Sequence, residues 1–206
     1  MTFLSATEKQ QIAEAIRVAE ANTQGELVCV IAPASNDYRF LPLLWSVLIA
    51  LSLPALVWLS QVWWTQAEVY LAQVAAFMLA LLLLHWPPLK MRLVPRSSQR
   101  THAARLAREQ FFAQQLHHTR ERTGVLVFVS VAERYVEILA DEGINSKVAP
   151  GTWDGVVRNF VTQVGAGRIA PGFLDAVAAC AKILAEHCPA QKENPNELPN
   201  RLIELE

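Results

Sequence analysis

The chain has 206 residues, of which 52% are hydrophobic and 18% are charged. An average soluble domain has roughly 25% charged residues, so the low value points away from an ordinary soluble protein. The net charge of −1 at pH 7 excludes the strongly basic character of nucleic-acid-binding domains, and we expect no nucleic-acid partner. Cys29, Cys180 and Cys188 are an odd set without CxxC spacing, which argues against a disulfide framework or a zinc site.

Residues 1–38 predict the first part of an α/β domain. Ser5 and Glu8 have the spacing of a capping box at a helix start. Residues 27–31 form a continuous apolar run rich in β-branched side chains, which is typical of a strand buried on both faces. The opening residues lack the apolar core of a signal peptide, so we expect a later segment to direct any membrane insertion.

Residues 39–89 predict a transmembrane hairpin. No charged residue occurs in residues 40–67 or in residues 69–89, and Glu68 stands alone between them. A helix needs about 20 apolar residues to cross the hydrocarbon core, and residues 41–60 and 69–87 meet that need. The alternative is a pair of buried helices in a soluble protein, although such helices are seldom so long and apolar on every side.

The positions of lysine and arginine predict an orientation for this hairpin. Arg39 precedes the first span, while Lys90, Arg92, Arg96 and Arg100 follow the second. The connection between the spans has no cation. The positive-inside rule therefore places both termini and the α/β domain in the cytoplasm. The basic run of residues 90–108 is also a candidate contact for anionic lipid headgroups.

Residues 90–188 predict the remainder of the α/β domain. Ser97 or Ser98 is a candidate cap for a helix that reaches about His118. Residues 125–131 and 135–140 are expected to form an antiparallel hairpin of strands, and two amphipathic helices follow at residues 152–164 and 171–187. Because neither flank can bury a core alone, we expect one mixed sheet with helices on both faces. Residues 189–206 are expected to be a C-terminal tail, docked through Leu202, Ile203 and Leu205.

Several of these segments resemble the TPM domain. They are the opening residues 5–28, the helix end at residues 114–123, the strand pair with its turn at residues 124–140, the helix at residues 172–174 and residues 196–199. The match is to the membrane-inserted bacterial branch, which implies the bacterial inner membrane. The resemblance implies a three-layer α/β/α sandwich with a small mixed sheet, here interrupted by the two-helix transmembrane hairpin. Members include photosystem II repair proteins and a receptor accessory subunit, and weak phosphatase activity and calcium binding have been attributed to some.

Asp141 and Glu142, at the predicted end of a strand, are the best candidates for a binding site. Carboxylates clustered there would hold calcium or another divalent cation through oxygen ligands, with Asp37 and Glu133 as contributors and Glu26 as a weaker addition. The alternative makes Asp141 the N-cap of a short helix at residues 142–148. The sequence contains no GxSxG, P-loop or HExxH motif.

Two functions follow from these features. The first is a non-enzymatic accessory module that is tethered to the lipid bilayer and binds a membrane-protein partner during assembly or quality control. The second is a weak metal-dependent phosphatase that uses Asp141, Glu142 and Asp37. The sequence leaves open whether the protein is an enzyme, and we favour the first.

Overall fold

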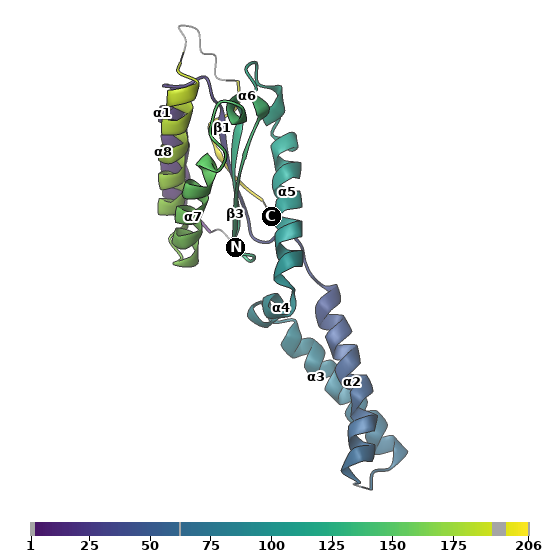
Figure 1. The fold of residues 1–206 in the computed structure, drawn as a ribbon. Coiled ribbons are helices and arrows are strands. Elements are labelled where there is room, and N and C mark those ends of the chain that lie inside the picture. The colour runs from purple at the N-terminus through teal and green to yellow at the C-terminus, as the bar shows by residue number, and fades with distance from the viewer. Residues whose placement is uncertain (1–2, 62, 191–196, 206) are drawn as a thin grey trace. The chain divides into compact units, whose positions relative to one another are not determined.

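The computed structural model describes residues 3–61, 63–190 and 197–205. The chain divides into two compact units (Figure 1). Residues 1–35 and 100–206 make up the first, which we call the α/β unit, and residues 36–99 make up the second, which we call the hairpin unit.

The α/β unit contains a four-stranded mixed sheet. Its elements, in chain order, are α1 (Ala6–Glu20), β1 (Leu27–Ala32), most of α5 (Arg96–Ala113), the 3₁₀ turn η1 (Leu116–His118), β2 (Val125–Ser130), β3 (Tyr135–Ala140), α6 (Glu142–Asn145), α7 (Thr152–Gly165), α8 (Ile169–His187) and β4 (Leu202–Glu204). The strand order is β3-β2-β1-β4. β1 runs parallel to β2 and to β4, whereas β2 and β3 are antiparallel, as expected for residues 125–140.

Side chains on the two faces of the sheet enter two separate cores. Cys29 and Val127 belong to the core that α1, α7 and α8 cover, and Phe173 of α8 is fully buried there. Val30 and Phe128 belong to the core on the other face, which α5 covers through Ala107 and Phe111. Every residue of β1 and β2 is buried, because both faces of these strands are covered. The expected three-layer α/β/α sandwich is therefore confirmed.

The local capping signals formed as the sequence predicted in α1, while α5 differs from the prediction. The Ser5 hydroxyl accepts from the Glu8 N–H at 3.2 Å, and a Glu8 carboxylate oxygen accepts from the Ser5 N–H at 2.8 Å. The helix α5 was expected to run from Ser97 or Ser98 to about His118, but it begins at Arg96 and ends at Ala113. Gln115 adopts a left-handed conformation with φ of 58°, which separates α5 from η1.

The C-terminal segment adds a strand that the sequence analysis did not include. Residues 189–206 were expected to be a tail, whereas Leu202–Glu204 form β4 at the edge of the sheet. Leu202 pairs with Cys29, and the Leu205 N–H donates to the Ile31 carbonyl at 2.9 Å. The sheet thus gains its edge from a segment that is distant in sequence.

The hairpin unit contains two apolar helices and a short third one. Its elements are α2 (Phe40–Ser60), α3 (Gln66–Leu84) and α4 (Pro87–Leu93). Both α2 and α3 are long and apolar enough to cross a membrane. α3 begins earlier than the expected residue 69, because Thr65 and Glu68 form a second capping box. α4 was not expected; it begins with Pro87 and Pro88, and proline is compatible with the first turn of a helix.

The contact between α2 and α3 leaves most of their large side chains exposed. The buried residues are small or short, namely Pro42, Ser46 and Ala50 in α2 and Ala80 in α3. Small residues at an interface let two helix backbones approach closely, which is typical of membrane helices. The exposed large side chains include Leu43, Trp45, Leu51, Trp58, Leu71 and Leu82. Within the described chain, the pair therefore presents an apolar surface on nearly all sides.

Candidate functional site

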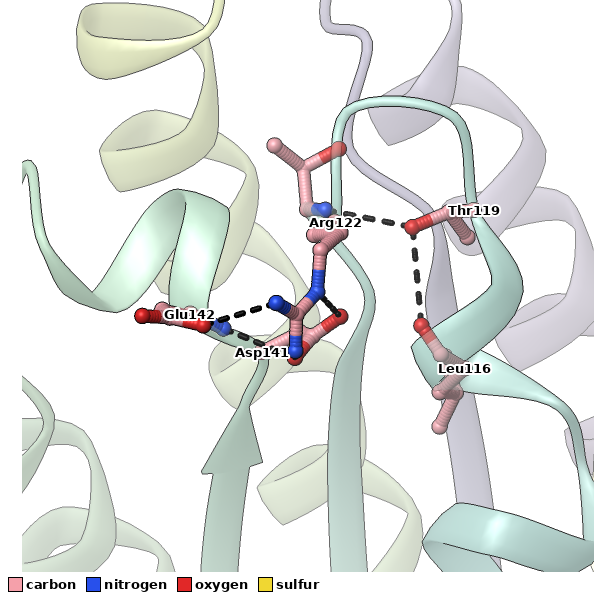
Figure 2. A network of polar contacts seen from close by, with 6 residues as sticks. Leu116, Thr119, Arg122, Asp141 and Glu142 are labelled. Carbon is pink, nitrogen blue, oxygen red and sulfur yellow. Dashed lines mark hydrogen bonds and ion pairs between the residues drawn. The ribbon is translucent and has the colours of Figure 1, made fainter.

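An arginine joins the two acidic residues that follow β3 (Figure 2). The Arg122 Nη1 donates to Glu142 Oε2 at 2.7 Å, and its Nη2 lies 3.3 Å from Asp141 Oδ1. The Asp141 side chain is 7% exposed, while that of Glu142 is exposed. The hydrogen bond to Asp141 raises the pKa of Arg122 above its ordinary value. The arginine thus engages both carboxylates that the sequence analysis had proposed as a site.

Asp141 also caps the short helix that follows it. Its Oδ1 accepts from the Glu142 N–H at 2.8 Å, and α6 begins at Glu142. The N-cap interpretation of Asp141 is therefore confirmed, although the helix ends at Asn145 rather than at residue 148. The Glu142 N–H and the Arg122 guanidinium both donate to the Asp141 carboxylate, and these two contacts fix its orientation.

The loop before β2 places Arg122 opposite these acids. Arg122 has a φ of 53°, and the Thr119 hydroxyl accepts from the Thr123 N–H at 3.2 Å and lies 3.5 Å from the Leu116 carbonyl oxygen (Figure 2). Gly143 lies against this loop, and a Cβ at its position would lie only 2.6 Å from the Arg122 carbonyl oxygen. Glycine at this position is thus what lets α6 pack against the loop, a role that its place in the sequence did not reveal.

The three predicted metal ligands of the α/β unit do not gather around one point. Asp141 and Glu142 follow β3, whereas Glu133 precedes it, and a six-residue strand separates their ends by roughly 20 Å. Asp37 belongs to the hairpin unit, where its carboxylate pairs with Arg39 at 2.9 Å. Among the described residues, no group of three or more His, Cys, Asp or Glu side chains is arranged to hold a metal ion. Calcium, which the resemblance implied, does not fit an acidic pair already engaged by a guanidinium group.

Glu133, at the opposite end of β3, has a structural role as a hydrogen-bond acceptor. Its Oε1 accepts from the Ser35 N–H at 3.0 Å and from the Ser35 hydroxyl at 2.7 Å, and its Oε2 accepts from the Ser130 hydroxyl. Ser35 is the last residue of the first segment of the α/β unit. Glu133 therefore fixes the point at which the chain leaves this unit for the hairpin.

Two further carboxylates, Glu20 and Glu26, are buried beside the start of β1. Glu20 is 7% exposed, and its Oε1 accepts from the Leu27 N–H at 2.8 Å. Burial raises the pKa of Glu20 to about 8, although the Leu27 hydrogen bond lowers it, and the nearby charge of Glu26 raises it further. Glu20 was not singled out by the sequence analysis, because a glutamate at a helix end ordinarily faces solvent.

Glu26 holds the C-terminal segment. It is 4% exposed, and its two oxygens accept from the N–H groups of Glu197 and Leu198 at 3.1 and 3.2 Å. Burial raises the pKa of Glu26, and these two hydrogen bonds oppose that rise. Glu26 was predicted as a weak metal ligand, but in the structure its acceptors are occupied by backbone N–H groups.

A groove of about 700 Å³ runs between α1 and α8. Its lining is rich in small apolar side chains, among them Ala15, Ala19, Ala178, Ala181 and Ala185. Glu14 lines it as well, and Arg17 already pairs with that carboxylate at 2.5 Å. The chemistry of the groove is that of a packing surface rather than an active site.

The model of the TPM domain family matches residues 91–183. The NMR structure of the BA42 protein from the psychrophilic bacterium Bizionia argentinensis is similar, with a TM-score of 0.63 and 21% sequence identity. The alignment covers 98% of this chain and 96% of the BA42 chain. At 21% identity, the similarity shows a shared fold only. No curated protein matches the chain.

Proposed function

Because the model of the TPM domain family matches residues 91–183, we propose that this chain is a membrane-anchored accessory module whose α/β unit binds a membrane-protein complex. In this proposal α2 and α3 cross the bacterial inner membrane, and the α/β unit with both termini lies in the cytoplasm. The module would assist the assembly or quality control of its partner without catalysing a reaction.

The exposure of the apolar helices carries this proposal. Only 17% of the most apolar stretch of α2 and 6% of that of α3 are buried, whereas the core helices of a soluble protein are mostly buried. A contiguous apolar surface of this kind must be covered by another apolar medium. Two helices of 21 and 19 residues match the thickness of the lipid bilayer.

The charges that flank the helices support the orientation. Arg39, Lys90, Arg92 and Arg96 belong to the hairpin unit, and none of them lies in the connection between α2 and α3. Trp63 and Trp64 in that connection are exposed and suit the opposite membrane interface. This distribution favours a cytoplasmic α/β unit.

The acidic residues of the α/β unit favour a binding role over a phosphatase. A phosphatase needs an activated nucleophile or a metal-bound water. The carboxylates of Asp141 and Glu142 are instead held by Arg122, and that of Glu26 by backbone N–H groups. These contacts build the fold around the N-terminal ends of β1 and β2.

Membrane insertion is tested first. Native membranes are extracted with alkaline carbonate. In a separate experiment, a protease is added to sealed vesicles of each orientation. We expect the chain to stay in the membrane and the α/β unit to be digested only in vesicles that expose their cytoplasmic face. Release by carbonate, or digestion from the other face alone, would contradict the proposal.

Partner binding is tested by affinity purification of the full chain in a mild detergent. We expect the same membrane protein to be recovered in repeated preparations, and a tag on that protein to recover this chain in return. A chain in which α2 and α3 are replaced by an unrelated transmembrane hairpin of equal length serves as the control and should retain the partner. Consistent recovery of a lone polypeptide would count against the module.

The phosphatase is tested on the same preparation. Hydrolysis of a phosphomonoester by the purified chain, with and without calcium, is compared with that of the Asp141→Asn variant. Activity that the wild-type chain shows and the variant loses would overturn the non-enzymatic assignment.

A further inference from the structure

The short helix α4 closes one end of the hairpin unit. It follows α3 after Trp86, and it contacts both α2 and α3. The Lys90 ammonium donates to the Asp37 carbonyl at 2.8 Å, and Asp37 in turn pairs with Arg39 before the first turn of α2. The start of α2 and the whole of α4 are thus held together at the end of the unit where α2 begins.

Positive charge accumulates at this end. Four cations lie there, Arg39, Lys90, Arg92 and Arg96, against the one carboxylate of Asp37. That carboxylate already serves Arg39. Arg92 and Arg96 are exposed, and the ion pairs of the described residues include neither of them. Two guanidinium groups therefore remain available at this end.

The location of the Arg92 and Arg96 guanidinium groups indicates which ligand they bind. A helix of 21 residues is about 32 Å long, close to the hydrocarbon thickness of a bilayer, so the cations beside its first turn lie at the depth of the lipid phosphates. Leu89, Met91 and Leu93 of α4 are half-buried, and the exposed Trp86 suits the interface. A guanidinium group binds a phosphate through two parallel hydrogen bonds.

We propose that α4, the first residue of α5 and the start of α2 form a binding site for the phosphate groups of anionic phospholipids, with Arg92 of α4 and Arg96 of α5 as the principal ligands. Lys90 connects α4 to the segment before α2 through the Asp37 carbonyl, and Lys90 and Arg39 add to the local positive potential. This proposal rests on the proposed membrane insertion and deepens it, because it assigns a specific lipid class to the cytoplasmic end of the hairpin.

The experiment uses the full chain in vesicles of phosphatidylcholine mixed with phosphatidylglycerol. The protein is released and the phospholipids that stay bound are identified by native mass spectrometry. We expect phosphatidylglycerol to be retained in preference to phosphatidylcholine. Each arginine near an anionic surface contributes about a five-fold preference, so Arg92→Gln with Arg96→Gln should reduce the preference about 25-fold.

Two control variants separate a site from a general charge effect. Arg158→Gln with Lys182→Gln removes two exposed cations from the α/β unit and should leave the lipid preference unchanged. Arg92→Lys with Arg96→Lys keeps the charge but removes the paired guanidinium hydrogen bonds, so it should lose part of the preference, whereas a general charge effect would leave the preference unchanged. Circular dichroism of each variant in detergent confirms that the helices remain formed.

Three results would overturn the proposal. One is equal retention of both lipids by the wild-type chain, and another is an equal loss in the α/β-unit control. The third is displacement of bound phosphatidylglycerol by inorganic phosphate at the same phosphate concentration, which would assign the site to a free anion. A chain that alkaline carbonate strips from the vesicles would overturn the proposed function together with this site, whereas a chain that stays inserted without lipid preference overturns this site alone.

Discussion

Replacement of Glu20 by glutamine should abolish a loss of stability that the wild-type α/β unit undergoes as the pH rises. Burial raises the pKa of this carboxyl from 4.5 to about 8, so the folded chain keeps the proton over a range in which the unfolded chain has lost it. The stability that this proton contributes is fully present below pH 4.5 and is lost as the pH rises towards 8. Glutamine keeps an oxygen that can accept from the Leu27 N–H, and it does not titrate.

The magnitude follows from the two pKa values. Between pH 5 and pH 7.5 the wild-type chain should lose about 3 kcal/mol of folding free energy through this group, and the Glu20→Gln variant should lose none of it. The difference between variant and wild type should therefore shift by about 3 kcal/mol in favour of the variant. Comparing two pH values cancels any constant effect of the substitution on packing.

Urea titration of the full chain in detergent, followed by circular dichroism, measures this shift. The exposed Glu14→Gln variant is the control on the same helix, because the hydrogen bond from Arg17 lowers the pKa of Glu14 and no gain with pH is expected. An equal difference between Glu20→Gln and wild type at both pH values would refute the assignment of a buried, protonated Glu20.

Four further substitutions test the packing of the α/β unit. Gly143→Ala should destabilise it by about 1–3 kcal/mol because the new methyl group meets backbone atoms, whereas Gly155→Ala, with open space around it, should stabilise it by about 0.5–1 kcal/mol; urea titration compares the two. Glu26→Ala should release the C-terminal segment, seen as faster amide hydrogen exchange in residues 197–205, at a loss of roughly 1–3 kcal/mol. Phe173→Ala removes a buried ring whose centroid lies 4.8 Å from that of Phe160, and should lower the free energy of unfolding by about 3–5 kcal/mol. Unchanged exchange in the Glu26 variant, or an unchanged urea midpoint in the other two unfavourable cases, would contradict these contacts.

The elements that the sequence predicted well are those whose signals are local. The capping box of Ser5 and Glu8, the apolar runs of β1 and β2, and the cap at Asp141 each depend on residues within a few positions of one another. Their outcome was therefore visible without knowledge of the tertiary fold.

The features that escaped prediction depend on contacts between distant residues. β4 has three residues, too few for a periodic signal, and it exists because it pairs with β1. Arg122 and Asp141 are brought together by the register of β2 and β3, in which Val125 lies opposite Ala140. The same register explains why the predicted metal site did not converge, since Glu133 and Asp141 lie at opposite ends of β3.

The hairpin unit lies within a connection that the sheet needs in any case. β1 and β2 are parallel, so the chain must cross from the end of one strand to the start of the other, and α5 covers one face of the sheet on the way. Each doubling of a flexible loop adds only about 0.6 kcal/mol of closure free energy, so a long insertion before α5 is compatible with the same sheet. Glu133 holds Ser35 at the start of this insertion, and the packing of Phe111 holds α5 after it.

We therefore expect the α/β unit to fold when a flexible glycine-serine linker replaces residues 36–99. The variant should be soluble without detergent, and it should unfold cooperatively in urea with the pH dependence predicted for Glu20. Adding Glu133→Ala to the linker variant should lower its stability, because the Ser35 N–H and the hydroxyls of Ser35 and Ser130 lose Glu133 as an acceptor. A linker variant that stays unfolded would show that the sheet depends on the hairpin unit, and the view of the hairpin as an insertion would then be wrong.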